Sequence, residues 1–160
     1  MRRLVAFPAV VLFLVALPFV TQANAAEEQD DEVQARHKKF EEMLSGVKLV
    51  GNFTILGKDD KMPEEEYTIT SVKKLEKDDL WLFKARIKYG NKDYTVPLPL
   101  AVKWADDTPM ITLTDFSILG QGPFSARVLF YDGKYAGTWS HGKVGGHLFG
   151  KIEKIKEEKE

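Results

Sequence analysis

Two histidines in a glycine-rich segment, Tyr135–Gly150, come closest to forming a chemical site in this sequence. His141 and His147 suit zinc, but zinc needs three or four converging ligands. Only a carboxylate from elsewhere, such as that of Asp115 or Asp132, could complete the set. A tight turn and close approach of backbones in a bent sheet account for the glycines. We therefore predict no metal site, and a metal-dependent enzyme using the two histidines is the least favoured function.

Other motifs that could support catalysis or cofactor binding each lack a necessary part. Gly142-Lys143 is not followed by the hydroxyl residue of a phosphate-binding loop. Gly120–Pro123 opens a predicted strand where a dinucleotide fingerprint opens a helix. The acidic pairs Asp78-Asp79 and Asp106-Asp107 fit turns better than acid–base chemistry. We predict no catalytic residues and no cofactor, and hence that the protein is not an enzyme.

Aromatic side chains are the remaining candidates for a functional site, and they are spread over most of the predicted strands. They either fill a packed interior or line an apolar pocket for a small ligand, and periodicity alone leaves both interpretations open. Arg86 and Arg127 lie on the polar faces of their strands and are candidates to orient an anionic ligand group. On the pocket interpretation the predicted ligand-binding residues are Phe53, Trp81, Phe83, Trp139 and His147.

These residues lie on a series of short predicted strands that follows one helix. From about Asp31 to Leu44, apolar residues recur at helical spacing, and Ser45-Gly46 ends the helix. After Gly46, runs of β-branched and aromatic residues alternate with Gly, Asn, Asp and Pro clusters. The eight predicted strands are Val47–Gly57, Tyr67–Leu75, Leu80–Tyr89, Tyr94–Trp104, Met110–Phe116, Phe124–Asp132, Tyr135–Ser140 and Gly146–Ile155.

The predicted fold class is mainly β: an antiparallel meander of about eight strands that closes into a barrel, with one short N-terminal helix. Closure removes the exposed edges that an open meander would carry. Pro97 and Pro99 predict a strand that is unpaired along part of one side, because two N–H groups directed the same way are missing. A split barrel and a sandwich with this strand at its edge therefore stay open as alternatives.

The beginning of the chain has the organisation of a secretion signal. Arg2 and Arg3 precede the apolar stretch Leu4–Val20, and Ala23-Asn24-Ala25 has the small residues that signal peptidases recognise. We predict cleavage between Ala25 and Ala26, export to the periplasm or the medium, and no membrane span in the mature protein. The predicted segments are a signal peptide 1–25, an acidic tail and helix 26–46, a single barrel-like domain 47–156 and a charged tail 157–160.

Composition excludes several classes of protein. The chain of 160 residues carries 23 basic and 24 acidic side chains, without the basic surplus of a nucleic-acid-binding protein. It has no cysteine, which excludes disulfides, thiolate metal sites, cysteine catalysis and a lipid-modified N-terminal cysteine. The length suits a single domain with its own core.

Several motifs resemble those of small secreted bacterial proteins of uncharacterised function. They cover about Val47 to Ile152, and the resemblance brings no known activity with it. The motifs are Gly51-x-Phe53-Thr54, Trp81-x-Phe83-x-Ala85-Arg86, Val96-Pro97-x-Pro99-Leu100, Asp107-Thr108-Pro109 and Phe124-Ser125-Ala126-Arg127, followed by the glycine-rich segment.

A looser resemblance is to lipocalin-like barrels, in which a short helix precedes a Gly-x-Trp strand. Here Gly51-x-Phe53 follows the predicted helix, with Phe in the place of Trp. The resemblance implies a lipocalin-like β-barrel, split if the proline-containing strand stays unpaired. It does not by itself transmit a function.

Two further functions stand as hypotheses beside the metal-dependent enzyme. The first is an exported, non-catalytic domain that binds a small, partly apolar ligand inside a barrel or at its mouth. The second is an extracytoplasmic protein-interaction or structural module with an envelope protein as its partner. The aromatic residues on most of the predicted strands favour ligand binding slightly over protein interaction.

Overall fold

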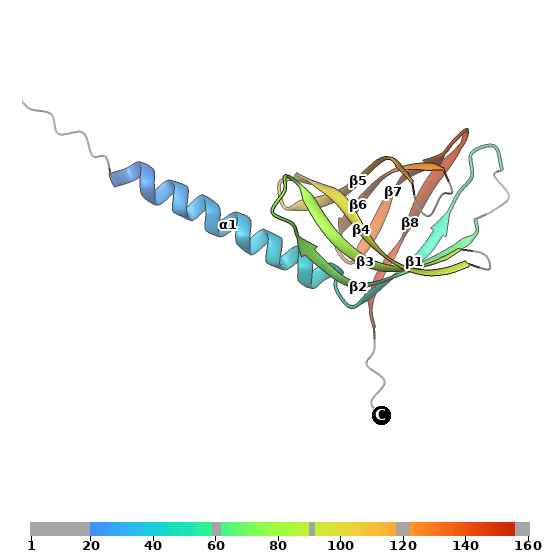
Figure 1. Cartoon of the computed structure of the whole chain (residues 1–160), viewed down its shortest axis with the longest axis horizontal. Helices are drawn as coiled ribbons and strands as arrows, with labels where there is room; N and C mark the ends of the chain where they lie inside the picture. The colour runs from blue at the N-terminus through green and yellow to red at the C-terminus, as the bar shows by residue number, and fades with distance from the viewer. Residues whose placement is uncertain (1–19, 59–61, 90–91, 118–121, 156–160) are drawn as a thin grey trace, which may run out of the picture. The chain divides into compact units, whose positions relative to one another are not determined.

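The computed structural model describes residues 20–58, 62–89, 92–117 and 122–155, and Figure 1 shows them as a helix followed by a β-barrel. The chain divides into two compact units, residues 1–33 and 34–160. In chain order the elements are α1 (Val20–Leu44), β1 (Val47–Phe53), β2 (Glu64–Lys74), β3 (Leu80–Tyr89), β4 (Lys92–Ala105), β5 (Thr108–Ser117), β6 (Pro123–Tyr131), β7 (Lys134–His141) and β8 (Val144–Lys154).

The described part of the first unit is the beginning of α1. The helix begins at Val20, earlier than the predicted start near Asp31, because the intervening Ala, Gln and Glu residues are good helix formers. Most of the predicted signal peptide, 1–25, lies outside the described residues, and cleavage between Ala25 and Ala26 stays a prediction. Among the helical residues that the structure describes, none forms a stretch long and apolar enough to cross a bilayer.

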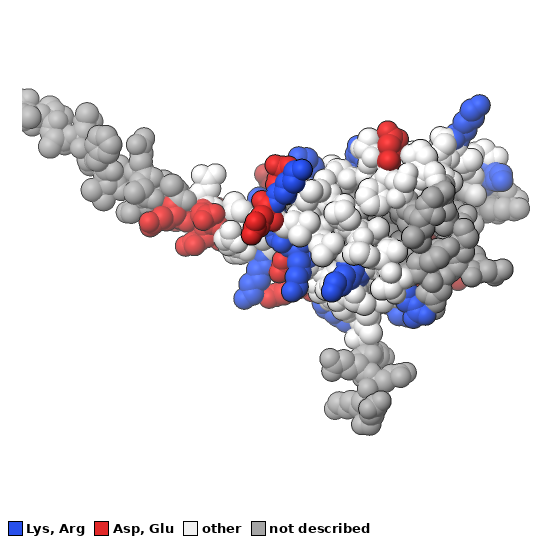
Figure 2. All heavy atoms as spheres, viewed as in Figure 1, with Lys and Arg blue, Asp and Glu red and all other residues white. Residues whose placement is uncertain are grey.

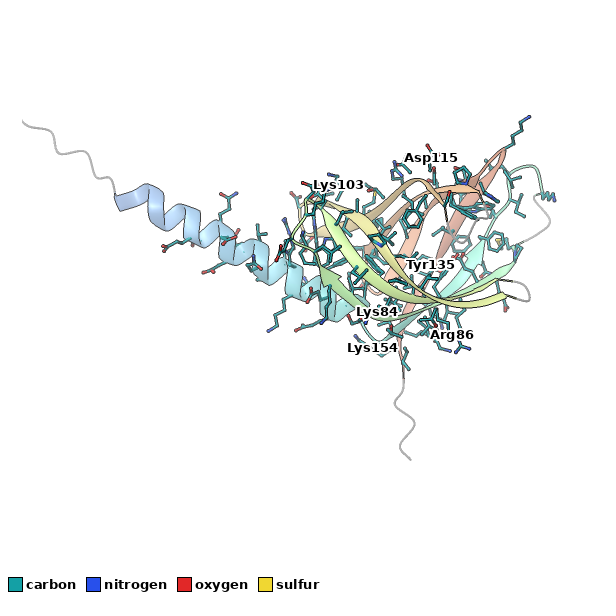
Figure 3. The ribbon with its side chains drawn as sticks, viewed as in Figure 1. Lys84, Arg86, Lys103, Asp115, Tyr135 and Lys154 are labelled. Carbon is teal, nitrogen blue, oxygen red and sulfur yellow. The ribbon has the colours of Figure 1, made fainter. Side chains whose placement is uncertain are left out.

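The strands of the second unit pair antiparallel in chain order, and β1 also pairs with β8, so that the sheet closes into a barrel. The predicted fold class, a mainly β eight-stranded barrel with one helix before the first strand, is confirmed. Alternation of apolar and polar residues gives the barrel wall an inner and an outer face. On β3, Trp81 and Phe83 are buried, whereas Lys84 and Arg86 are exposed. Figure 3 shows these two basic side chains on the outside of the wall.

The last turns of α1 pack into one end of the barrel. Phe40 and Leu44 are almost fully buried. The ring of Phe40 meets Trp81 edge-on at a centroid distance of 4.8 Å and Trp104 at 5.5 Å. Gly46, at φ 64°, then ends the helix in a left-handed conformation and turns the chain into β1. The helix therefore supplies part of the barrel core.

The pairing between β4 and β5 is much shorter than that between β4 and β3. β4 pairs with β3 from Lys92 to Ala101, but with β5 only from Ala101 to Ala105. Within the described residues, the stretches Pro97–Leu100 of β4 and Leu113–Ser117 of β5 share no register pair. We call this unpaired stretch the β4–β5 seam; Figure 1 shows the two strands diverging along it.

The two prolines explain the seam. The N–H of Val102 donates to the carbonyl of Asp79 at 2.9 Å, on the side of β4 that faces β3. Alternate residues of a strand direct their hydrogen-bonding groups to opposite sides, so Pro99 and Pro97 direct theirs towards β5. Neither has an N–H to donate. The predicted unpaired stretch is confirmed, and it coexists with closure because Ala101–Ala105 still pair.

Candidate functional site

Two of the predicted ligand-binding residues, Trp81 and Phe83, lie in the core at the helix end of the barrel. Trp81 is 0% exposed and Phe83 is 2% exposed. Both rings meet the ring of Phe40 edge-on, at centroid distances of 4.8 and 6.2 Å. The packed-interior interpretation therefore describes these two residues.

Two others, Phe53 and Trp139, lie together on the inward face further from the helix. Their rings are edge-on with centroids 5.7 Å apart, and both side chains are half-buried. The indole N–H of Trp139 donates to the carbonyl oxygen of Thr54 at 3.2 Å. Both residues pack against the core on one side and stay partly accessible on the other.

The fifth predicted residue, His147, faces outward from β8. Its backbone N–H donates to the hydroxyl of Thr54 at 3.0 Å, and its Nδ1 lies 3.3 Å from the same oxygen. At Gly146, a Cβ would overlap the carbonyl oxygen of Thr54. The glycine-rich segment thus allows the chain after β1 to lie close against β8. Of the His, Asp and Glu residues that the structure describes, no three group closely enough to hold a metal ion.

Half-buried side chains face inward at the end of the barrel away from Phe40. Ala126 of β6 pairs with Leu113 of β5 and with Trp139 of β7, so these positions form one row across the sheet. The rings of Phe124 and His141 form the next row and stack at 4.1 Å with an interplanar angle of 12°. We call this set the mouth cluster: Phe53, Leu113, Phe116, Phe124, Trp139 and His141.

The two ends of the barrel interior differ in burial. At the helix end, the inward-facing Trp81, Phe83 and Val102 are at most 2% exposed, and the ring of Phe40 packs against Trp81 and Phe83. At the mouth cluster, every member keeps part of its surface accessible. None of the described segments covers the mouth cluster as α1 covers the opposite end. The mouth cluster is therefore an inward-facing apolar surface in contact with solvent.

Of the mouth cluster, Phe53 and Trp139 are among the predicted ligand-binding residues, and that role stays a prediction; the other four members are not among them. For His141 a signal was present, since alternation from Tyr135 through Trp139 places it on the inward face. For Phe116 the alternation of inward- and outward-facing residues does not predict the position. A bulge between Leu113 and Phe116, with Asp115 at φ 49°, shifts the alternation along β5.

A carboxyl group also faces the interior, on β2. The Tyr67 hydroxyl donates to Oε2 of Glu65 and the Tyr135 hydroxyl donates to Oε1, both at 2.9 Å. Burial raises the pKa of Glu65, against the opposing effect of the two hydrogen bonds. Burial and the nearby carboxylate also raise the pKa of Tyr67 and of Tyr135. Figure 3 shows Tyr135 within the barrel.

Gly51 makes room for this arrangement. It pairs with Glu65 on one side and with Gly150 on the other. A Cβ at Gly51 would lie 2.6 Å from the Tyr135 hydroxyl oxygen. No local pattern indicates the Glu65 site, because three consecutive glutamates from position 64 are typical of an exposed segment.

The outer face of the wall carries exposed apolar side chains on β6 and β8. Leu129, Tyr131 and Phe149 are 39%, 65% and 41% exposed; we call them the outer-wall patch. They line a shallow cavity of about 380 Å³ that adjoins a second one of about 700 Å³. Figure 2 shows, on the face it draws, that uncharged side chains make up most of the barrel wall.

Comparison with known proteins adds nothing to this geometry: no family model, curated protein or solved structure matches the chain.

Proposed function

We propose that the protein is a non-catalytic binding module that takes a small, partly apolar ligand at the mouth cluster. The observation that carries the proposal is the contrast in burial along the barrel interior. Side chains of the same apolar kind face inward at both ends. Trp81, Phe83 and Val102 at the helix end are almost fully buried, whereas every member of the mouth cluster keeps accessible surface. Covering that surface would stabilise a complex by roughly 25 cal/mol per Å² of apolar area removed from water.

The side chains of the mouth cluster suit a ligand with a flat or linear apolar body. The edge-on pair Phe53 and Trp139 and the stacked pair Phe124 and His141 present ring surfaces from neighbouring strands. The imidazole of His141 places a polar ring among these apolar ones. The catalytic alternatives have no comparable support from the described residues.

Equilibrium binding of N-phenyl-1-naphthylamine, a neutral apolar fluorophore, tests the proposal. Phe124→Ala removes a ring from the mouth cluster and is expected to weaken binding about tenfold. Tyr131→Ala removes a ring from the outer-wall patch and is the matched control, with unchanged affinity. No binding to the wild-type protein, or equal loss in both variants, would overturn the proposal.

The outer-wall patch favours protein interaction as a second candidate function. Its cavities have glutamates 64 and 66 at one side and lysines 134 and 151 at the other, around the exposed Phe149. These charges suit a partner segment that carries apolar side chains between a basic and an acidic end. If Tyr131→Ala, and not Phe124→Ala, weakens the binding of the fluorophore, this second candidate replaces the first.

We also propose export, on the strength of Arg2, Arg3 and the apolar stretch that follows them. Mass spectrometry of the protein from culture medium or periplasm is expected to find Ala26 at the N-terminus. Recovery of a chain that retains Met1 would contradict export by cleavage.

A further inference from the structure

The β4–β5 seam is blocked against pairing along its β4 edge. On β4, Pro97 and Pro99 lack the N–H groups that would reach β5. On its other side, β5 has a bulge against β6 between Leu113 and Phe116, where the N–H of Asp115 donates to the hydroxyl of Ser125 at 3.0 Å. Prolines and bulges are features that keep strand edges from pairing. The seam is therefore a poor template for an added strand, and the two strands stay separate there (Figure 1).

Apolar side chains line the inner side of the seam and lead to the mouth cluster. Leu98 of β4 and Leu113 of β5 face inward on the two sides of the seam, and both are half-buried and in contact with the core. Leu113 is itself a member of the mouth cluster, and Phe116 follows it along β5. An apolar group that crosses the seam thus reaches the mouth cluster directly.

The guanidinium of Arg127 is a cation on the outer face of the barrel. Hydrogen bonds hold it over β5, the strand that forms one side of the seam. Arg127 of β6 reaches over β5, where its Nη1 donates to the carbonyl oxygens of Leu113 and, at 2.7 Å, Ala126. Its Nη2 donates to the hydroxyl of Thr114 at 2.9 Å. These partners are all neutral, and within the described residues no carboxylate pairs with this guanidinium. The three bonds hold the guanidinium in place and leave its Nε–H and one Nη2–H for an anion.

We infer that the ligand is an amphipathic monoanion that enters through the β4–β5 seam and places its anionic group on Arg127 and its apolar body in the mouth cluster. The inference rests on the proposed function for the apolar body and adds the anionic group and the route. A guanidinium already fixed by hydrogen bonds loses little side-chain freedom when it binds a carboxylate.

Competition between decanoate and the bound naphthylamine tests the anionic group. Arg127→Gln is expected to weaken decanoate binding about tenfold, while the affinity for the neutral naphthylamine is unchanged. Arg127→Lys keeps the charge and is expected to retain most of the decanoate affinity. Arg86→Gln, an exposed arginine on the outer face of β3, is the matched control. Equal decanoate affinity in the wild type and in Arg127→Gln would overturn the inference.

A second measurement keeps this test decisive if Arg127→Gln does not fold. Raising the salt concentration on the wild-type protein is expected to weaken decanoate binding and to leave naphthylamine binding unchanged, since salt screens an exposed charge. Decanoate binding that does not respond to salt would overturn the anionic site.

Restoring the missing N–H groups tests the route. The double variant Pro97→Thr, Pro99→Thr allows the pairing of β4 with β5 to extend, and is expected to slow decanoate association several-fold in stopped-flow measurements. Amide hydrogen exchange at positions 97 and 99 reports whether the pairing has extended. Unchanged association in a protein with protected amides there would overturn the route through the seam.

The outcomes separate the inference from the proposed function. If the wild-type protein binds neither probe, the proposed function fails and the inference fails with it. Naphthylamine can instead bind the wild-type protein and bind Phe124→Ala more weakly, while decanoate has the same affinity for the wild type and for Arg127→Gln. In that case the proposed function stands and only the inference fails.

Discussion

At the scale of single residues, a carboxyl group that faces the inside of a barrel needs hydrogen bonds or a proton to offset the loss of water. Glu65 has two phenol donors, and its pKa is raised because burial disfavours the charged form more than these donors favour it. The folded protein therefore holds a proton on Glu65 more tightly than the unfolded chain does.

This raised pKa predicts a specific dependence of stability on pH. The contribution of Glu65 to stability is fully present below its ordinary pKa of 4.5 and is lost as the pH rises through the raised value in the folded protein. In Glu65→Gln the side chain at position 65 is neutral at every pH. The melting temperature of this variant is therefore expected to increase relative to that of the wild type as the pH rises. Thermal unfolding between about pH 4 and about pH 8 measures the difference.

Glu64→Gln, an exposed neighbour on the same strand, is the control for a general effect of net charge. A constant difference between Glu65→Gln and the wild type over the whole pH range would contradict the prediction.

Residues such as Glu65 also mark the limit of what the sequence could predict about the candidate site. Alternation places Phe53 and Trp139 on an inward face, which the structure bears out. Alternation cannot say how deep along the barrel a side chain lies, so Trp81 in the core and Trp139 near the mouth appear equivalent in sequence. A half-buried carboxyl such as that of Glu65 depends on partners from distant strands, here Tyr135 of β7, and has no local pattern.

At the scale of elements, the strands were predictable because each carries its own alternation and ends at turn residues. The prolines of β4 predicted that pairing is interrupted along part of one side, and the structure shows that this side faces β5. The role of α1 was less accessible. Its apolar stripe, which includes Phe40 and Leu44, indicates a packing face, but not that this face completes the core at one end of a barrel.

Shortening Phe40 tests the contribution of α1 to the core. Phe40→Ala removes a ring that contacts Trp81, Phe83 and Trp104, and is expected to lower the free energy of unfolding by about 3–5 kcal/mol. Lys39→Ala, an exposed neighbour on the same helix, is expected to stay within about 0.5 kcal/mol of the wild type. Urea denaturation measures both, and a loss in Phe40→Ala no larger than in the control would show that α1 is not part of the core.

At the scale of the whole molecule, the barrel is closed by the pairing of its first strand with its last. Gly51 and Gly150 face each other in this pair, and Tyr135 lies against both. Closure therefore depends on the absence of side chains at the place where β1 meets β8.

Adding one methyl group at this place tests its importance for the whole barrel. In Gly51→Ala the new Cβ would overlap the carbonyl oxygen of Phe149, so we expect a loss of about 2–3 kcal/mol in the free energy of unfolding. Lys48→Ala changes the same strand on its outer face and is expected to cost less than about 1 kcal/mol. Chemical denaturation compares the two, and similar values would show that β1 and β8 adjust at no cost.

The pairing of β1 with β8 also fixes the order in which the molecule can be completed. A growing polypeptide emerges from the ribosome with its N-terminus first. β1 is therefore available long before β8, its second neighbour in the barrel, has been translated. Until then one edge of β1 has no partner, and contacts between residues so distant in sequence form slowly. The barrel of the nascent protein therefore cannot close until β8, the last of the described strands, has been translated.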